Sequence, residues 1–258
     1  MIQNLSRISS IQNIAGNIWA ISIHAPEVAS IVKPGQFINI KISEYNTPLL
    51  RRPFSVQRID GDEIAIIFSV FGLGTLLLSQ KKPGENLDII GPLGNAFNID
   101  GSFETAVLVA GGIGVAPLPF LTSSLRQSTR KIITFLGART STQIISQYLE
   151  NVSIATDDGS MGYHGTVVDL LRLHLSVQKY QNTKIFACGP TPMLRSISDL
   201  ILEIDVPCEA SFESAMACGF GICQGCPVEL TDQKKKYALV CKDGPVFDIR
   251  SIRIPANG

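Results

Sequence analysis

The rhythm of the apolar segments changes near residue 100. Before that point the chain carries short runs rich in β-branched and aromatic residues, separated by turns such as Lys33-Pro34-Gly35 and Lys82-Pro83-Gly84-Glu85. Short strands at this spacing predict an antiparallel barrel or sandwich. The runs are Trp19–Ile23, Gln36–Ile42, Phe54–Arg58, Ile64–Val70 and Leu87–Ile90.

Beyond residue 100, continuous apolar runs alternate with helical segments. Ala106–Ala110 ends in glycines, and the sequence predicts a helix near Pro117–Arg126 followed by a strand at Lys131–Leu136. A later strand at Lys184–Cys188 precedes a helix at Thr191–Ile204. Buried strands that alternate with helices predict a parallel sheet built from βαβ units.

The expected fold class is therefore β followed by α/β, in three parts. These parts are an antiparallel β-barrel domain over residues 1–100, a parallel-sheet α/β domain over 101–207, and a small Cys- and Gly-rich segment over 208–258. The chain has 258 residues, which at roughly 150 residues per domain corresponds to about 1.7 domains. Two modest domains with a small addition fit that length.

Four of the six cysteines lie close together near the C-terminus. Cys218, Cys223, Cys226 and Cys241 form the pattern C-x4-C-x2-C-x14-C, which is the plant-type spacing for a 2Fe-2S cluster. The interleaved glycines permit the unusual backbone angles that a loop around a cluster needs. Structural zinc and unligated buried thiols are the alternatives. Zinc sites more often show two separated C-x2-C pairs, so the spacing favours the cluster.

Charge and hydropathy exclude several classes of protein. Lys plus Arg equals Asp plus Glu at 22 each, so there is no basic field to attract nucleic acid. The first residues contain no apolar core after a basic start, and no stretch approaches the ~20 apolar residues that span a bilayer. We therefore expect an unexported, cytoplasmic protein. In a reducing compartment, disulfides are not expected, and Cys188 and Cys208, outside the pattern, are interpreted as ordinary buried cysteines.

Two motifs in the first part suit a nucleotide. Arg52-Pro53-Phe54-Ser55 places a guanidinium and a hydroxyl at a strand start, where they can hold a pyrophosphate and the edge of a ring. Phe71-Gly72-Leu73-Gly74-Thr75 is a Gly-rich turn entering a helix, which offers N–H groups to a phosphate. An ordinary strand-to-helix turn is the plain alternative for the second motif.

Two strand ends in the second part outline a crevice. Gly111-Gly112-Ile113-Gly114-Val115-Ala116-Pro117 follows the first buried strand, where ligands bind in parallel sheets, although it is not the G-x-G-x-x-G fingerprint. Cys188-Gly189-Pro190 repeats the arrangement of a strand, a Gly-containing turn and a helix. Carboxyl ends of parallel strands meet at one edge, so these turns are expected to face the same ligand.

The order R-P-x-S, G-x-G-T, G-G-x-G-x-A-P and C-G-P-x-x-M resembles the ferredoxin-NADP reductase superfamily over nearly the whole chain. With the C-terminal cysteines and Asp243-Gly244-Pro245-Val246-Phe247 added, the chain closely resembles the electron transfer subunits of dihydroorotate dehydrogenase B. The resemblance implies an FAD-binding barrel, an NAD-binding α/β domain and a 2Fe-2S segment. Position by position it implies FAD contacts at Arg52, Pro53, Phe54, Ser55, Ile67, Phe68, Ser69, Gly74 and Thr75, and cluster ligands at Cys218, Cys223, Cys226 and Cys241. Many relatives carry Tyr where this chain has Phe54.

Nicotinamide contacts are expected in the crevice. Gly112 and Gly114 are expected to floor the site, and Cys188, Gly189 and Pro190 to line it. The pair Asp157 and Asp158 is expected to face the adenosine ribose, where carboxylates repel a 2'-phosphate and accept hydrogen bonds from a 2'-hydroxyl, so NADH is favoured over NADPH. Simple capping of a turn is the alternative for these aspartates.

The resemblance implies a redox subunit in pyrimidine (UMP) biosynthesis. Electrons would pass between NAD and the FMN of a dihydroorotate dehydrogenase catalytic subunit through FAD and the cluster, in a heterotetramer of two copies of each chain. No residue is assigned a catalytic role, because His24, His164 and His174 are scattered and no site for dihydroorotate is evident.

Two other functions remain open from the sequence. A small subunit of an NAD(P)H-ferredoxin oxidoreductase or sulfide dehydrogenase shares this domain order. A zinc-bearing interaction module on a degenerate flavoprotein fold is the second, and retention of Arg52, Ser55, Gly74 and Thr75 argues against it. Apolar side chains around the cluster loop, including Phe220 and Ile222, are predicted to dock the partner.

Overall fold

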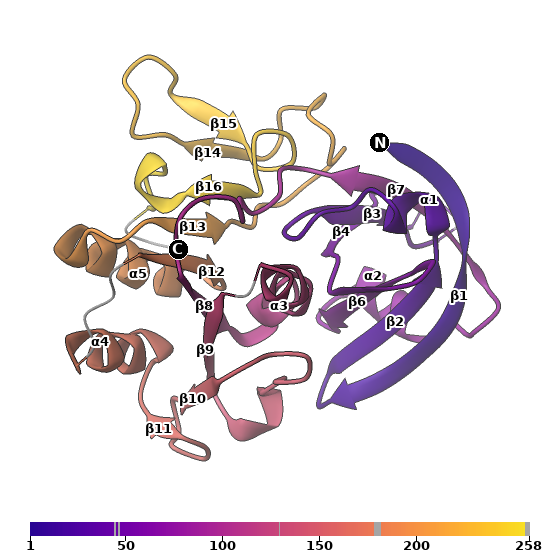
Figure 1. Cartoon of the computed structure of the whole chain (residues 1–258). Coiled ribbons are helices and arrows are strands. Elements are labelled where there is room, and N and C mark those ends of the chain that lie inside the picture. The colour runs from indigo at the N-terminus through magenta and orange to yellow at the C-terminus, as the bar shows by residue number, and fades with distance from the viewer. Residues whose placement is uncertain (44, 46, 129, 178–181, 256–258) are drawn as a thin grey trace.

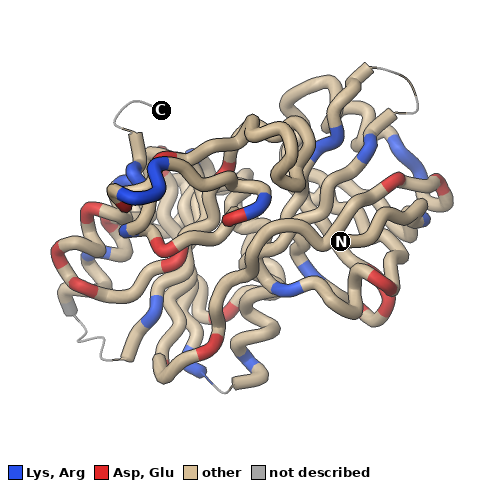
Figure 2. Tube along the Cα trace, turned by 90° about the horizontal axis from the view of Figure 1, so that it is seen from above, with Lys and Arg blue, Asp and Glu red and all other residues tan. Residues whose placement is uncertain are grey.

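The computed structural model describes residues 1–43, 45, 47–128, 130–177 and 182–255. Two seven-stranded sheets form two bodies side by side, and the C-terminal residues lie across one end of both (Figure 1). Lys and Arg residues are interspersed with Asp and Glu residues along the trace (Figure 2). Within the described residues, no helix combines the length and apolarity needed to cross a membrane.

The first sheet is antiparallel, which confirms the prediction for this part of the chain. Its strand order is β4-β3-β7-β1-β2-β6-β5. The strands are β1 (Ile2–Ala15), β2 (Ile18–His24), β3 (Phe37–Lys41), β4 (Arg52–Ser55), β5 (Arg58–Asp60), β6 (Glu63–Ser69) and β7 (Asn86–Leu93), with the helices α1 (Pro26–Ala29) and α2 (Leu73–Ser79) between them.

A corner in the chain brings the two ends of this sheet together. The sequence predicted one strand over Phe54–Arg58, and the structure divides it into the ends of β4 and β5. The Val56 N–H bonds to the Gln36 carbonyl beside β3, whereas the next N–H, of Gln57, bonds to Ala65 of β6. The chain thus changes partner from one edge of the sheet to the other, and the sheet curls into a barrel.

The longest strand, β1, is absent from the sequence predictions. Its fourteen residues are mostly polar, and only Ser6 and Ile8 are buried. Backbone pairing with β2 and β7 on its two sides holds it in place. Exposed polar residues such as Gln3 and Arg7 interrupt its apolar residues, and Leu5 is itself 72% exposed, so the strand gives a weak hydrophobic signal.

The second sheet contains the predicted parallel strands. Its order is β11-β10-β9-β8-β12-β13-β16, and every pair is parallel except β13 with β16. The strands are β8 (Thr105–Gly111), β9 (Lys131–Ala138), β10 (Val152–Thr156), β11 (Tyr163–His164), β12 (Thr183–Cys188), β13 (Cys208–Ser211) and β16 (Val246–Asp248).

Helices cover both faces of this sheet (Figure 1). They are α3 (Leu118–Arg126), α4 (Val167–Val177) and α5 (Thr191–Ile204), with short 3-10 turns at Gly112–Val115, Ser141–Gln143 and Ile249–Ser251. Along β8, Val107 and Val109 pack with α4 and α5, while Leu108 packs with α3. The alternation of side chains along a strand thus gives each face its own core.

The C-terminal residues are tied to both bodies. Strands β13 and β16 extend the parallel sheet, and a small hairpin of β14 (Pro227–Glu229) and β15 (Tyr237–Leu239) lies beyond them. Asn95, just after the barrel, donates hydrogen bonds from its backbone N–H to the Gly244 carbonyl and from its side chain to the Asp243 carbonyl, each 2.6 Å long. These bonds set the cysteine-bearing residues against the barrel.

Candidate functional site

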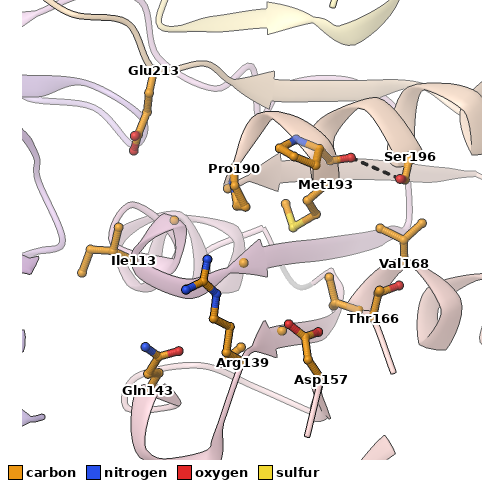
Figure 3. Close-up of a pocket in the computed structure, with 18 residues that line it drawn as sticks. Ile113, Arg139, Gln143, Asp157, Thr166, Val168, Pro190, Met193, Ser196 and Glu213 are labelled. Atoms are coloured by element: carbon orange, nitrogen blue, oxygen red, sulfur yellow. Dashed lines mark hydrogen bonds between the residues drawn. The ribbon is translucent and has the colours of Figure 1, made fainter. Parts of the chain in front are cut away.

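A cavity of about 470 Å³ opens at the carboxyl ends of the parallel strands (Figure 3). We call it the strand-end cavity. It is lined by Gly111–Gly114 after β8, by residues 137–139 and Gln143 after β9, by Asp157, by residues 166–168 at the start of α4, and by Gly189, Pro190, Pro192, Met193, Ser196 and Glu213. The predicted residues Gly112, Gly114, Gly189 and Pro190 are therefore brought together in one cavity.

Two glycines allow the strand ends to meet there. A Cβ on Gly114 would lie 2.4 Å from the Cys188 carbonyl oxygen, and a Cβ on Gly189 would lie 2.5 Å from the Met193 methyl carbon. At Gly114 the neighbouring atoms are backbone, so glycine is needed there for close approach, whereas the Met193 methyl group beside Gly189 is the end of a flexible side chain that can shift.

The two aspartates after β10 have separate roles. Asp157 lines the strand-end cavity. Asp158 instead accepts a 2.9 Å hydrogen bond from the Ser160 N–H, and its hydrogen bonds with Ser160 lower the pKa of the Asp158 carboxyl. Asp157 thus faces the cavity and Asp158 caps a turn, while contact of Asp157 with an adenosine ribose stays a prediction. Arg139, which the sequence analysis missed, points into the cavity across from Glu213 (Figure 3).

A second cavity, of about 540 Å³, lies between the barrel and the parallel sheet. We call it the barrel cavity. The residues predicted to contact FAD that line it are Arg52, Pro53, Phe54, Ser55, Ile67, Phe68, Ser69 and Thr75. Cys188, predicted to line the nicotinamide site, lines this cavity and is not among the residues of the strand-end cavity. The remaining wall comes from Phe37, Leu50, Phe71, Ile113, Ala116, Pro117, Pro245 and the run 211–216.

Gly74, the remaining residue predicted to contact FAD, acts by making room. A Cβ there would lie 3.0 Å from the Arg52 Nε, so the bare backbone lets the guanidinium lie against the first turn of α2. Arg52 also donates a 2.7 Å hydrogen bond to the Leu50 carbonyl. This fixes a cation at the cavity wall.

Thr75 and Phe54 also serve the fold around the barrel cavity. The Thr75 hydroxyl accepts hydrogen bonds from the backbone N–H groups of Phe71 and Gly72 at 3.1 and 3.3 Å, which orders the turn before α2. Phe54 is buried and packs edge-on against Phe68, with ring centroids 5.6 Å apart. Phe54 thereby joins the barrel core as well as the cavity wall.

Ile113 and Glu213 line both cavities, so the two spaces adjoin. Glu213 is exposed, because it faces these openings, and desolvation by the surrounding protein nevertheless raises the pKa of its carboxyl. The sequence analysis missed Glu213. Its only signal was its position after an apolar strand and five residues before the first cysteine of the cluster pattern.

The four patterned cysteines meet in one loop region as two pairs. The Cys223 N–H points to the Cys218 sulfur, and the Cys241 N–H points to the Cys226 sulfur, each at 3.4 Å. Cys226 and Cys241 are buried, whereas Cys223 is exposed. Among the described residues, no three His, Cys, Asp or Glu groups gather tightly enough to hold a single metal ion. These backbone contacts join Cys218 with Cys223 and Cys226 with Cys241.

Backbone N–H groups lower the pKa of the first cysteine of the loop, Cys218. Burial opposes ionisation of Cys218, but hydrogen bonds from the backbone N–H groups of Cys223, Phe220 and Ile222 outweigh it and lower the pKa to about 6. Burial, together with the neighbouring Cys226 thiol, raises the pKa of Cys241 to about 12. A positive φ at Gly219 and Gly221 forms this loop, as the sequence predicted for its glycines.

Cys188 and Cys208 differ from the loop cysteines. Both are buried in the parallel sheet, and desolvation raises the pKa of each thiol, for Cys188 to about 12. These values describe neutral, inert thiols.

The donor sets suit the groups that the sequence implies. Thiolates are the ligands of iron–sulfur clusters, and N–H groups aimed at the sulfurs of Cys218, Cys223 and Cys226 stabilise negative charge there. A guanidinium over an aromatic-lined cavity suits a pyrophosphate attached to a flat ring system. The glycine-floored strand ends suit a nucleotide.

Other predicted residues lie outside the cavities. His24 and His164 are exposed strand residues. His174 on α4 contacts Phe135 of β9, and burial lowers the pKa of its imidazole. Ile222 is 76% exposed beside the cluster loop, whereas Phe220 is half-buried against the cluster of Phe37, Leu93, Cys226, Val240 and Cys241. Ile222 therefore offers the larger exposed apolar surface of the two.

Comparison with known proteins supports this arrangement. A family model described as the iron-sulfur cluster binding domain of dihydroorotate dehydrogenase B matches residues 213–253. The electron transfer subunit of dihydroorotate dehydrogenase B (NAD(+)) from Desulforamulus reducens is 37% identical over 250 residues, covering 94% of this chain and 95% of the relative. The subunit of the same name from Bacillus pumilus is 38% identical over 256 residues, with 96% of each chain covered.

Solved structures agree on the fold. The structure described as an NADH-dependent reduced ferredoxin-NADP oxidoreductase that bifurcates electrons superposes with a TM-score of 0.87 at 29% identity, covering 97% of this chain and 90% of that one. Phthalate dioxygenase reductase superposes with a TM-score of 0.67 at 16% identity, covering 93% and 94%. The second likeness shows the fold alone.

Proposed function

The chain belongs to the family of dihydroorotate dehydrogenase B electron transfer subunits, and we propose that it conducts electrons between NAD and the FMN of a dihydroorotate dehydrogenase catalytic subunit. The electrons would pass through FAD and a 2Fe-2S cluster. The reaction would serve UMP biosynthesis. One observation carries the proposal. The strand-end cavity adjoins the barrel cavity through Ile113 and Glu213, and the barrel cavity adjoins the cysteine loop through Phe37 and Met216, which also pack with Cys226 and Cys241.

The proposed contacts follow the cavities and the loop. FAD would be held by Arg52, Pro53, Phe54, Ser55, Ile67, Phe68, Ser69, Gly74 and Thr75, and the nicotinamide nucleotide by Gly112, Gly114, Cys188, Gly189 and Pro190. The cluster would be held by Cys218, Cys223, Cys226 and Cys241. The three parts 1–100, 101–207 and 208–258 would carry FAD, NAD and the cluster.

In this proposal, the residues of the chain bind and orient the nucleotides and exclude water. Arg52 would offer donors to a pyrophosphate, and the close contact at Gly114 shapes a floor that would take a nicotinamide. Glu213 supplies the carboxylate where the two cavities adjoin. When bound, FAD exchanges two electrons as hydride on one side and releases them singly on the other. The buried Phe37 and half-buried Met216 keep water from the space between the barrel cavity and the buried thiols.

The site supports NADH over NADPH. Asp157 lines the strand-end cavity, and a carboxylate there repels a 2'-phosphate while it accepts a hydrogen bond from a 2'-hydroxyl. Arg139 points into the same cavity, and its positive charge acts against this preference (Figure 3). We propose that the Asp157 carboxylate decides the preference, and substitution of Asp157 tests it.

The test is an assay of the complex that co-purifies with the tagged chain from its native host under anaerobic conditions. We expect an FMN-containing companion, as a heterotetramer of two copies of each chain from the cytoplasm, and NADH-dependent reduction of orotate. A preparation that holds FAD and iron but does not reduce orotate would contradict the proposed partner.

A second function is favoured by one observation. The TM-score of 0.87 to the NADH-dependent reduced ferredoxin-NADP oxidoreductase covers nearly the whole chain. In the same assay, reduction of ferredoxin in place of orotate would assign the chain to a small subunit of that class, or of a sulfide dehydrogenase.

A further inference from the structure

Strand β3 has two different faces. Ile38 and Ile40 are fully buried inside the barrel core. Phe37 and Asn39, which alternate with them, point to the other side, toward the C-terminal residues. An asparagine that is 0% exposed on such a face needs an explanation, because a buried amide is costly unless it is hydrogen-bonded.

Asn39 reaches the first cysteine of the cluster loop. Its Nδ2 donates a 3.1 Å hydrogen bond to the Cys218 carbonyl oxygen, across 179 residues of sequence. The next residue is packed so closely that a Cβ on Gly219 would lie 2.3 Å from Nδ2, and Gly219 has a φ of +78°. Glycine at position 219 is therefore what allows the loop to settle onto this amide.

The same strand borders the barrel cavity. In the pairing of β3 with β4, Asn39 lies opposite Pro53 and Phe37 lies opposite Ser55, and both partners line that cavity. Phe37 itself lines the cavity and belongs to the apolar cluster of Cys226 and Cys241. Phe37, on this face of β3, therefore contacts both the barrel cavity and the apolar cluster of Cys226 and Cys241.

We propose that Asn39 is a positioning residue that holds the Cys218 end of the cluster loop at a fixed place over the barrel. The inference rests on the proposed function, since it presupposes that the four cysteines carry a cluster. Phe37 packs against Cys226 and Cys241, and Asn39 makes the hydrogen bond to Cys218.

The peptide geometry explains how one amide can act on a ligand. A peptide unit is planar, so holding the Cys218 carbonyl on Asn39 also fixes the direction of the Gly219 N–H, which points the opposite way. That peptide begins the run of residues whose N–H groups surround the Cys218 sulfur. Without the Asn39 amide, the part-buried Cys218 carbonyl loses its donor and the loop can turn to find another.

Asn39 also has an unused acceptor. Its Oδ1 is buried and has no hydrogen-bond partner among the described residues. The amide is therefore held in place by the Cys218 carbonyl and by packing, and not by a wider polar network. Replacing it by a side chain of similar size removes one specific bond.

The experiment compares two variants of the anaerobically purified holoprotein. Asn39→Leu keeps the approximate size and removes the donor. Ile40→Val, on the same strand but facing the barrel core, is the matched control for loss of stability. The readouts are the electron paramagnetic resonance spectrum and midpoint potential of the reduced cluster, iron release to a chelator, and the flavin absorption spectrum.

For Asn39→Leu we expect an altered cluster spectrum, a potential shifted to more negative values, and iron release about 10-fold faster, as for loss of partners just outside a metal's ligands. The flavin spectrum stays unchanged. Ile40→Val leaves all the cluster readouts at wild-type values. If Asn39→Leu does not fold, Asn39→Ser, which shortens the side chain and keeps it polar, is judged by the same criteria.

A wild-type cluster spectrum and iron release rate in the Asn39 variant would overturn the inference, as would equal changes in the Ile40→Val control. Failure of the proposed function would show differently. It would appear in the wild-type protein, as absence of iron or of orotate reduction, before any variant is compared.

Discussion

The cluster loop and the strand-end cavity are built in opposite ways. In the loop, four thiols are the candidate ligands, and glycines with positive φ let the backbone surround them. In the strand-end cavity, part of the wall is bare backbone, as at Gly114, where no Cβ fits, and the charge comes from Arg139, Asp157 and Glu213. A site carried by side chains should fail completely at one substitution, whereas one built on backbone should show graded effects.

Loss of a loop cysteine should have the largest effect. Cys226→Ser removes a buried ligand, so we expect the affinity for iron to fall by more than about 100-fold, beyond what loss of a neighbouring partner causes. Iron content and visible absorption report the loss. Oxidation of NADH by a dye that takes electrons from FAD should persist, because Cys226 itself lines neither cavity.

The matched control for that variant is Cys208→Ser. Cys208 is equally buried but lies in the parallel sheet. Iron content should remain at the wild-type level. Retention of iron by Cys226→Ser, or its loss from Cys208→Ser, would break the distinction between the two classes of cysteine.

A Cβ at the strand ends should have the next largest effect. Gly114→Ala forces a carbon to within 2.4 Å of the Cys188 carbonyl oxygen, and overpacking of this kind costs about 1–3 kcal/mol. We expect a lower free energy of unfolding and weaker NADH binding, measured by denaturation and titration. Gly72→Ala meets nothing within 4 Å and has an extended backbone, so it should change neither.

The aspartates after β10 should separate specificity from stability. Asp157→Asn removes a charge that faces the cavity, and we expect the ratio of kcat/KM for NADPH to that for NADH to rise by about 10-fold, the size of one moderate charge interaction. Asp158→Asn should leave the ratio unchanged, because its carboxylate caps a turn. Equal effects of the two changes would contradict the division of roles.

The smallest expected effect concerns Glu213. Desolvation raises the pKa of its carboxyl in the folded chain above the ordinary value of 4.5, so the folded state keeps a proton that the unfolded state has lost. The free energy of unfolding therefore falls as pH rises from 4.5 through the folded pKa, with a slope below about 1.4 kcal/mol per pH unit, because solvent screens this exposed carboxyl. Denaturation at several pH values should show this slope, and Glu213→Gln should reduce it.

The sequence predicted the loop better than the cavities, for a physical reason. Cysteine spacing is explicit in the chain, so Cys218, Cys223, Cys226 and Cys241 could be named together before their contacts were known. Arg139 and Glu213 reach the strand-end cavity only through the parallel sheet, and neither belongs to a local pattern. Asn39 looked like any residue of a strand, and its partner lies 179 residues away.

Prediction of the fold likewise succeeded where the sequence carries an explicit pattern. Apolar runs such as Ala106–Ala110 identified the buried strands, because both faces of the parallel sheet are covered. The polar β1 and the helix α4 were missed. The longest strand is stabilised mainly by backbone pairing with its two neighbours, which leaves little hydrophobic pattern in its sequence.

The most direct test of the account is a count of metals and flavin in the chain purified without air. Iron, inorganic sulfide, zinc and FAD are measured in one preparation, together with the electron paramagnetic resonance spectrum after reduction by NADH. The account predicts two irons and two sulfides for each FAD, with a reduced 2Fe-2S signal that NADH alone produces. Zinc in place of iron, or an iron cluster that NADH cannot reduce in the presence of bound FAD, would contradict it.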